Sequence, residues 1–208
     1  MNCILCKSNT SPFFNTKDRS YFKCDTCASV FMNPSEFPSN NEEKTRYLTH
    51  NNDVNDVGYQ KFVEPIVKAI LANFDSTKIG LDFGCGTGPV ITKLLEEQSF
   101  NMAIFDPIFE NDIAVLNTKY DFIVCCEVIE HFHHPLKEFQ LLKSLLKPKG
   151  KLYCMTDLFS EEINFEKWYY KNDLTHVIFY QKNTFKWIKE SVVFSKVTVN
   201  NRLITFEN

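Results

Sequence analysis

The sequence has no long hydrophobic run, no start that resembles an export signal and no large excess of charge of one sign. Its longest apolar runs, such as residues 122–126, are far too short to cross a bilayer. The first thirty residues lack the basic start and apolar centre of a signal peptide. The net charge of −3 provides no general attraction to nucleic acid. We therefore expect a soluble, cytoplasmic protein with no membrane partner, and nucleic acid is not favoured as a partner.

The chain is long enough for one full core and one small additional module, since 44% of its 208 residues are hydrophobic. It contains no internal repeat and no low-complexity tract. Four paired cysteines near the start predict a small module over residues 1–32. Residues 33–57 are rich in Asn, Ser, Pro and Asp, which predicts a linker or cover segment with little regular structure. The main domain is expected over residues 58–208.

Strand and helix patterns alternate through this main domain. Apolar residues at helical spacing predict a helix over 59–74, in which Pro65 indicates a kink or a start near Glu64. The alternation predicts an α/β fold with a doubly wound, mostly parallel sheet. The expected strands lie at 79–83, 102–105, 122–126 and 151–156, the helices between them at 89–98 and 135–147, and two further β-rich runs at 192–199 and 202–206.

Closely spaced glycines follow the first of these strands. Gly84, Gly86 and Gly88 would let the backbone turn sharply and approach a ligand, with the next helix presenting its free N–H groups. The dinucleotide fingerprint needs two residues before its last glycine, and only one is present here, which argues against NAD. Asp106 ends the next strand at the spacing where an acid accepts hydrogen bonds from a ribose diol. The combination favours a nucleoside cofactor over a purely structural turn.

Three ordered segments carry a resemblance to a known family. Leu81–Gly88 resembles motif I of the class I S-adenosylmethionine-dependent methyltransferases, Tyr120–His131 resembles their central strand motif, and Leu145–Leu152 resembles the segment before the following strand. The resemblance covers residues 58–190. It implies a Rossmann-like sheet that ends in an antiparallel hairpin, with S-adenosylmethionine lying over the glycine loop.

The resemblance also implies roles for individual residues. Asp82 and the loop would hold the methionine part of the cofactor, Asp106 the ribose, and Glu127 would lie beside the sulfonium. The implied cofactor-binding residues are Asp82, Gly84, Cys85, Gly86, Thr87, Gly88, Asp106 and Glu127. Only fourteen residues separate Asp106 from Asp121, where the family usually has a helix and a strand. We expect this unit to be missing or reduced, which leaves Asp112 as the candidate adenine-binding acid.

A Glu-x-x-Glu-His segment follows the central strand. Glu127, Glu130 and His131 could bind a divalent ion or supply a general base. In the ubiquinone-pathway O-methyltransferases and the small-RNA 2′-O-methyltransferases a similar segment holds a metal, and by that resemblance His176 would be a fourth ligand. In other methyltransferases the segment caps or pairs within the fold. The third possibility is a general base that works without a metal. Glu130, His131 and His176 are therefore the candidate catalytic residues.

The amino-terminal cysteines form two Cys-x-x-Cys pairs. Seventeen residues lie between the pair Cys3 and Cys6 and the pair Cys24 and Cys27, a spacing that suits two knuckles around one tetrahedral zinc ion. Four thiolates leave no open position, so the zinc would be structural and its binding energy would stabilise the module. A redox pair or disulfides are the alternatives. The other cysteines are interpreted as small buried hydrophobes and not as nucleophiles: Cys85, Cys125, Cys126 and Cys154.

The methyl acceptor is the open question. Similar knuckles precede the methyltransferase domain in some ribosomal-RNA and some deoxysugar C-methyltransferases, so the module could recognise a macromolecule or cover one side of the pocket. Tyr47, His50 and Tyr59 are candidate pocket residues, and the aromatic stretch 165–187 is interpreted as core packing more than as a lid. We expect methyl transfer from S-adenosylmethionine to O, N or C of a small metabolite or sugar. The alternatives are an RNA methyltransferase or a binding scaffold with a non-catalytic methyltransferase-like domain.

Overall fold

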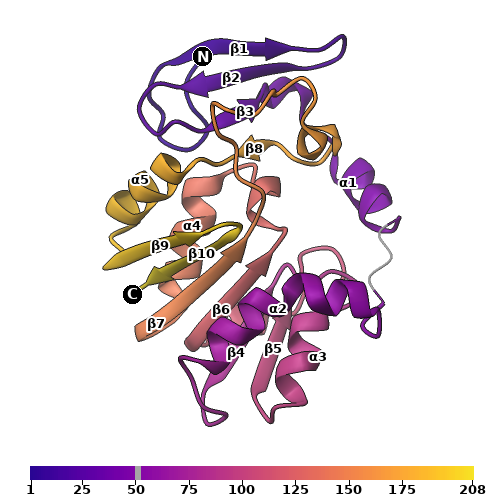
Figure 1. Ribbon diagram of the computed structural model, residues 1–208, viewed down its shortest axis with the longest axis vertical. Coiled ribbons are helices and arrows are strands. Elements are labelled where there is room, and N and C mark those ends of the chain that lie inside the picture. The colour runs from indigo at the N-terminus through magenta and orange to yellow at the C-terminus, as the bar shows by residue number, and fades with distance from the viewer. Residues whose placement is uncertain (50–52) are drawn as a thin grey trace.

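The computed structural model describes residues 1–49 and 53–208, and it contains two β-sheets (Figure 1). The larger sheet has six strands in the order β5-β4-β6-β7-β10-β9, and the smaller has four in the order β1-β2-β3-β8. Figure 1 shows the small sheet stacked above one end of the large one. None of the helices in the described residues is both long and apolar enough to span a membrane.

The large sheet is mostly parallel. Its parallel neighbours are β5 (Asn101–Phe105), β4 (Ile79–Phe83), β6 (Tyr120–Cys126) and β7 (Leu146–Met155). Two antiparallel strands complete it, β10 (Leu203–Glu207) and β9 (Lys196–Asn200). Buried β-branched and aromatic side chains line its central strands, as expected for a sheet covered on both faces. The fold class expected from the sequence is therefore confirmed, including the final hairpin.

The short link between β5 and β6 explains why β5 is the edge strand of the sheet. Residues 107–119 contain no further strand and only one short 3-10 helix, Ile113–Asn117, among the described residues. A chain of this length cannot form a crossover helix and another parallel strand. The reduced unit predicted from the sequence is confirmed.

Two pairs of helices cover the two faces of the large sheet (Figure 1). The helices α2 (Val57–Leu71) and α3 (Val90–Glu96) contribute to one apolar cluster, and α4 (Pro135–Ser144) and α5 (Lys182–Val192) contribute to the other. The Asp56 side chain caps α2 by accepting a hydrogen bond from the Tyr59 amide at 2.7 Å. The helix therefore begins before Pro65 and continues through it, so a start near Glu64 is wrong.

The cysteine module does not form its sheet alone. Its strands β1 (Thr10–Asn15), β2 (Ser20–Cys24) and β3 (Val30–Met32) are joined by β8 (Ile178–Phe179), which comes from the far end of the chain. Leu5 and Phe31 are fully buried in the same apolar cluster as α4 and α5. The module is thus joined to the main domain by backbone pairing and by a shared core. The domain boundaries at residues 32 and 57 remain predictions.

Residues 33–57 contain more regular structure than expected. A 3-10 helix spans Pro34–Glu36, and α1 spans Asn40–Tyr47. A reciprocal capping box between Ser39 and Glu42 starts α1. The sequence reading missed this helix because it buries no side chain and therefore has no apolar periodicity. His50, a predicted pocket residue, lies outside the described residues.

The aromatic residues around position 165 pack in a core, which is the interpretation that the sequence favoured over a lid. Phe159, Phe165, Trp168 and Phe179 form a buried cluster in which most ring pairs meet edge to face or tilted. Module residues Tyr21, Val30 and Met32 belong to the same cluster. This cluster therefore packs the segment around residues 159–170 against the small sheet.

Candidate active site

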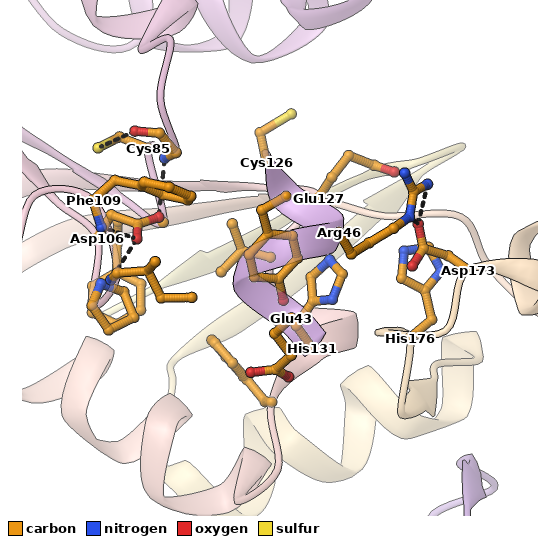
Figure 2. A pocket seen from close by; sticks show the side chains of 18 of the residues that line it. Glu43, Arg46, Cys85, Asp106, Phe109, Cys126, Glu127, His131, Asp173 and His176 are labelled. Carbon is orange, nitrogen blue, oxygen red and sulfur yellow. Dashed lines mark hydrogen bonds and ion pairs between the residues drawn. The ribbon is translucent and has the colours of Figure 1, made fainter. Parts of the chain in front are cut away.

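A cavity of about 940 Å³ opens at the carboxyl ends of β4, β5 and β6. Parallel α/β sheets bind their ligands at this edge. The cavity is lined by the glycine loop, residues 105–109, residues 126–133, residues 169–176 and the inner side of α1 (Figure 2). Its volume is near the upper end of the range for small-molecule sites. It can hold a nucleoside cofactor together with a second small molecule.

The glycine loop is held by hydrogen bonds to the end of β5. Gly84 has φ +79°, and a Cβ there would lie 2.5 Å from Val128 Cγ2, so only glycine fits. The Gly86 amide donates to Asp106 Oδ2 at 3.1 Å. Asp106 Oδ1 accepts from the amides of Ile108 and Phe109 at 2.8 and 3.0 Å. Asp106 therefore organises the loop as well as facing the cavity, as Figure 2 shows.

Three predicted cofactor residues do not line the cavity. Asp82 is buried beneath the loop, where it accepts a hydrogen bond from Thr92 Oγ1 at 2.9 Å, and burial raises its pKa to about 6. Gly88 also lies outside the lining, and Asp112 instead caps the 3-10 helix at Ile113. The lining around residue 107 is apolar: Pro107, Ile108, Phe109 and Leu116. Of the predicted loop residues, Gly84, Cys85, Gly86 and Thr87 do line the cavity.

Glu127 directly follows β6 and lies in the left-handed region, with φ +52°, a conformation that is uncommon for residues other than glycine. Both of its carboxylate oxygens accept from Arg202 Nη2 at 2.8 Å. Burial and the neighbouring Glu130 raise the pKa of Glu127, and Arg202 opposes that shift. The sequence reading missed Arg202 because it lies in the turn between β9 and β10, 75 residues from its partner.

Glu130, His131 and His176 form a compact group, although the two histidines are 45 positions apart in the sequence. One ligand atom from each lies within 4.8 Å of the others. Glu130 is fully buried, and Tyr170 donates to its Oε1. Glu130 Oε2 has no hydrogen-bond partner among residues 1–49 and 53–208. Glu127, also named as a possible ligand, is not in this group, and Arg202 engages both of its oxygens.

Backbone carbonyls set the tautomers of both histidines. His131 Nδ1 lies 2.9 Å from the Thr175 carbonyl, and His176 Nδ1 lies 2.7 Å from the Tyr170 carbonyl. A carbonyl only accepts, so each Nδ1 carries the hydrogen and each Nε2 keeps its lone pair. Burial lowers the pKa of His131, and burial together with His131 lowers that of His176 to about 3. Both rings are therefore neutral at pH 7, and each Nε2 can bind a metal or accept a hydrogen bond, while the low pKa of His176 makes it a weak base.

Helix α1 closes the other side of the cavity through polar contacts. Arg46 donates to Asp173 Oδ2 from Nε at 3.0 Å and from Nη2 at 2.7 Å. His133 Nε2 lies 3.0 Å from Glu43 Oε1. The ring of Tyr47 meets that of His131 edge to face at 5.3 Å. The structure places the predicted Tyr47 and Tyr59 on the cavity wall, whereas the Arg46–Asp173 pair had no local sequence signal.

The four amino-terminal cysteines converge, and no disulfide joins them. Cys3 Sγ lies 3.6 Å from Cys27 Sγ, and Cys6 Sγ lies 3.3 Å from Cys24 Sγ. In a tetrahedral site with Zn–S bonds of about 2.3 Å, sulfurs are about 3.8 Å apart. The donor set and its spacing therefore fit a zinc ion. The hydrogen bond between Cys3 and Cys27 lowers the pKa of Cys3 to about 5 and raises the pKa of Cys27, so this pair keeps one proton until a metal replaces it.

Comparisons with known proteins agree with this geometry. A family model described as a methyltransferase domain matches residues 57–198. The chain is 30% identical over 95 residues to a ubiquinone biosynthesis O-methyltransferase from Actinobacillus pleuropneumoniae, which is 44% of this chain and 41% of that protein. The chain thus spans less than half the length of the curated relatives that it matches.

Solved structures share the fold at low identity. The 1,6-didemethyltoxoflavin-N1-methyltransferase of Burkholderia thailandensis, solved with its substrate and S-adenosylhomocysteine, has a TM-score of 0.57 and 13% identity over 95% of this chain and 99% of that one. A SAM-dependent methyltransferase from Archaeoglobus fulgidus has a TM-score of 0.53 and 19% identity over 67% of this chain and 71% of that one. At these identities the likeness is one of fold.

Proposed function

The chain belongs to the methyltransferase domain family, and we propose that it transfers a methyl group from S-adenosylmethionine to a nucleophilic O, N or C of a small metabolite. The observation that carries this proposal is one cavity with two unlike ends. One end has the glycine loop and Asp106, and the other has His131 and His176, two neutral histidines with the fully buried Glu130 behind them. A cofactor at the first end would direct its reactive group toward the second.

The proposed cofactor residues fall into two groups, those that face the cavity and those that support the glycine loop from beneath. The loop amides and Asp106 face the cavity and would contact the cofactor directly, while Asp82 would support the loop from beneath through Thr92. Phe109 and Leu116 offer apolar contacts where an adenine-binding acid was expected. S-adenosylmethionine supplies an electrophilic methyl group on a sulfonium, so the protein mainly has to position two reactants.

His131 would remove the proton of the methyl acceptor, and His176, a weaker base, would orient that acceptor through a hydrogen bond. The Nε2 atoms of His131 and His176 carry lone pairs, and their Nδ1 hydrogens are engaged by backbone carbonyls that orient the rings. A neutral imidazole in this orientation can accept a proton from a hydroxyl or amine. Tyr170 would hold Glu130 and Glu127 beside them, since its hydroxyl lies within hydrogen-bond distance of both carboxylates.

The same group also fits a divalent ion, which is the finer proposal for this end of the cavity. Glu130 Oε2 is buried and unpartnered among the described residues, and both imidazole Nε2 atoms are unprotonated. Backbone carbonyls on the opposite ring nitrogens are a typical support for metal-bound histidines. A bound ion would polarise an acceptor hydroxyl. Calorimetry with Mn²⁺ tests this: binding that is lost in His176→Ala supports the ion, and no binding to the native chain refutes it.

We further propose that the four cysteines hold a structural zinc ion. All four sulfurs belong to a closed, mostly buried cluster, which leaves no position for a substrate. The ion would stabilise a module of about thirty residues whose own core is small.

The acceptor is proposed to be small because of the charges around it. Glu43, Glu138 and Asp173 line the acceptor side, and Arg46 is the cation among the lining residues described. A phosphate backbone would be repelled there. The named relatives act in ubiquinone biosynthesis or on 1,6-didemethyltoxoflavin, which are small molecules.

A binding experiment followed by a transfer experiment tests the proposal. S-adenosylhomocysteine at a hundred times its dissociation constant should stabilise the folded chain by about 2.7 kcal/mol. Incubation with methyl-labelled S-adenosylmethionine should label a fraction of small metabolites and not RNA. No stabilisation by either cofactor form would contradict methyl transfer, and label only in RNA would contradict the small acceptor.

A further inference from the structure

The cysteine module does not line the cavity. Among the described residues, the first lining residue is Asn40, beyond the module. The module is nevertheless paired with β8, whose first residue comes two positions after His176. The module is therefore connected to the site through backbone pairing, and it does not form part of the cavity wall.

Val177 links the module to the site. Its carbonyl accepts from the Met32 amide at the end of β3, and its amide donates to the Glu130 carbonyl, both at 2.9 Å. The register pairs Val30 with Phe179 and Phe31 with Ile178. All these residues of β3 and β8 are at most 1% exposed, so water cannot readily replace these bonds.

The cysteine loop itself contacts this segment. Gln181 follows β8, and its Nε2 donates to the Ala28 carbonyl at 2.8 Å. Ala28 lies directly after Cys27, in the left-handed conformation with φ +60°. The position of that carbonyl therefore depends on how the second cysteine pair is folded.

Tyr170 provides a second, side-chain connection. It packs in the cluster that contains Tyr21, Val30 and Met32 of the module. Its carbonyl accepts the Nδ1 hydrogen of His176, and its hydroxyl contacts Glu130. Tyr170 therefore packs against the module and also contacts two of the candidate catalytic residues.

We propose that the four-cysteine module positions the acceptor side of the cavity, acting through β8 and Tyr170 on His176 and Glu130. This inference rests on the proposed function, because it supposes that His176 and Glu130 lie on the side of the cavity that binds the methyl acceptor. The module would act on that side and not on the cofactor side. Gln181, Val177 and Met32 are positioning residues. The glycine loop is outside this path, because its hydrogen bonds run to β5.

Hydrogen exchange on the full chain, measured without cofactor, tests the inference. Gln181→Ala removes the contact with the cysteine loop and leaves the four cysteines in place. We expect amides in residues 173–181 to exchange about three- to tenfold faster, which is the effect of losing one hydrogen bond, with residues 79–90 unchanged. In a Trp187→Phe background, Trp168 is the remaining tryptophan, and its emission should shift in the Gln181→Ala variant.

Gln60→Ala is the matched control, because Gln60 Nε2 makes the same kind of bond to the Val54 carbonyl at 2.9 Å, outside this path. It should leave residues 173–181 unchanged. Cys27→Ser should exceed the Gln181→Ala effect, and if that variant does not fold, Gln181→Ala still decides. Unchanged exchange at 173–181, or an equal rise at the glycine loop, overturns the inference. Failure of the native chain to bind S-adenosylhomocysteine would count against the proposed function and leave the exchange result standing.

Discussion

The two ends of the cavity are built in different ways. The cofactor end comes from short stretches at the tips of neighbouring parallel strands, and Gly86 and Asp106 meet there through a direct hydrogen bond. The acceptor end combines α1, the end of β6, residues 169–176 and the C-terminal hairpin turn. The cofactor end depends on the order of neighbouring strands, which the glycine motif and the acid after the next strand indicate in the sequence. The acceptor end depends on contacts between segments up to 127 residues apart, such as that between Arg46 and Asp173.

The two ends of the cavity also differ in their ionisable groups. At the acceptor end, the pKa values of Glu127 and Glu130 are raised by burial, and those of His131 and His176 are lowered by burial. Clusters of groups shifted in this way are typical of sites that transfer protons. The cofactor end has a buried but hydrogen-bonded Asp82 and backbone amides. Binding and chemistry are thus assigned to opposite ends, and each prediction below changes one end.

The largest effect is expected from the module. Cys27→Ser should abolish zinc binding and lower the free energy of unfolding by several kcal/mol, because metal binding stabilises small four-cysteine modules by about 10 kcal/mol or more. Elemental analysis and guanidinium unfolding measure both quantities. Cys154→Ser, a buried cysteine outside the cluster, should keep the zinc. Native protein without zinc would refute the site.

Arg202→Met should destabilise the acceptor end by about 2 kcal/mol, because it leaves Glu127 without its cation in a largely buried position. Urea unfolding measures the loss. The double variant with Glu127→Gln should recover part of it, since the unpaired charge is then gone. Equal stability of the single and double variants would show that the ion pair does not account for the effect.

Asp106→Ala should weaken binding of S-adenosylhomocysteine about 10- to 100-fold, because Asp106 organises the loop amides and faces the expected ribose. Isothermal titration calorimetry measures the affinity. Asp112→Ala is the control: Asp112 caps the 3-10 helix that carries Leu116 but does not itself line the cavity, so the affinity should change much less than in Asp106→Ala. An equal loss of affinity in Asp112→Ala would restore Asp112 as a cofactor residue.

The smallest effect concerns the contact between α1 and residue 173. Burial alone would raise the pKa of Asp173, but hydrogen bonds from Thr175 and Arg46 outweigh it and hold that pKa below the ordinary value of 3.8. The stabilisation is therefore complete above about pH 3.8 and is lost as pH falls below it. Asp173→Asn should cost about 1 kcal/mol at pH 6, with a smaller difference at pH 3. A difference that does not change with pH would exclude the ion pair as its cause.

Much of the fold followed from local patterns. The strand over 79–83, the glycine loop and the helix from Pro135 were predicted near their observed bounds, because apolar periodicity and turn residues act over a few residues. The reduced link after Asp106 was predicted by comparing its length with the helix and strand that the family usually has there. Helix α1 was missed because a capping box and ion pairs stabilise it, and none of its side chains is buried.

The candidate site was predicted in parts. Glu130, His131 and His176 were named, and the structure brings them together. Their tautomers depend on the carbonyls of Thr175 and Tyr170, which no motif encodes. Arg202 was not predicted, and its pairing with Glu127 engages both oxygens of that possible metal ligand.

The sequence by itself determined the family, the sheet type, the glycine loop and the pairing of the cysteines, because each depends on residues that are close together in the chain. Only the tertiary structure decided that β8 joins the module's sheet, that Asp82 lies beneath the cavity and not in it, and that Arg202 pairs with Glu127. The physical reason is that hydrogen bonds and ion pairs between distant segments form only after the core has brought those segments into contact.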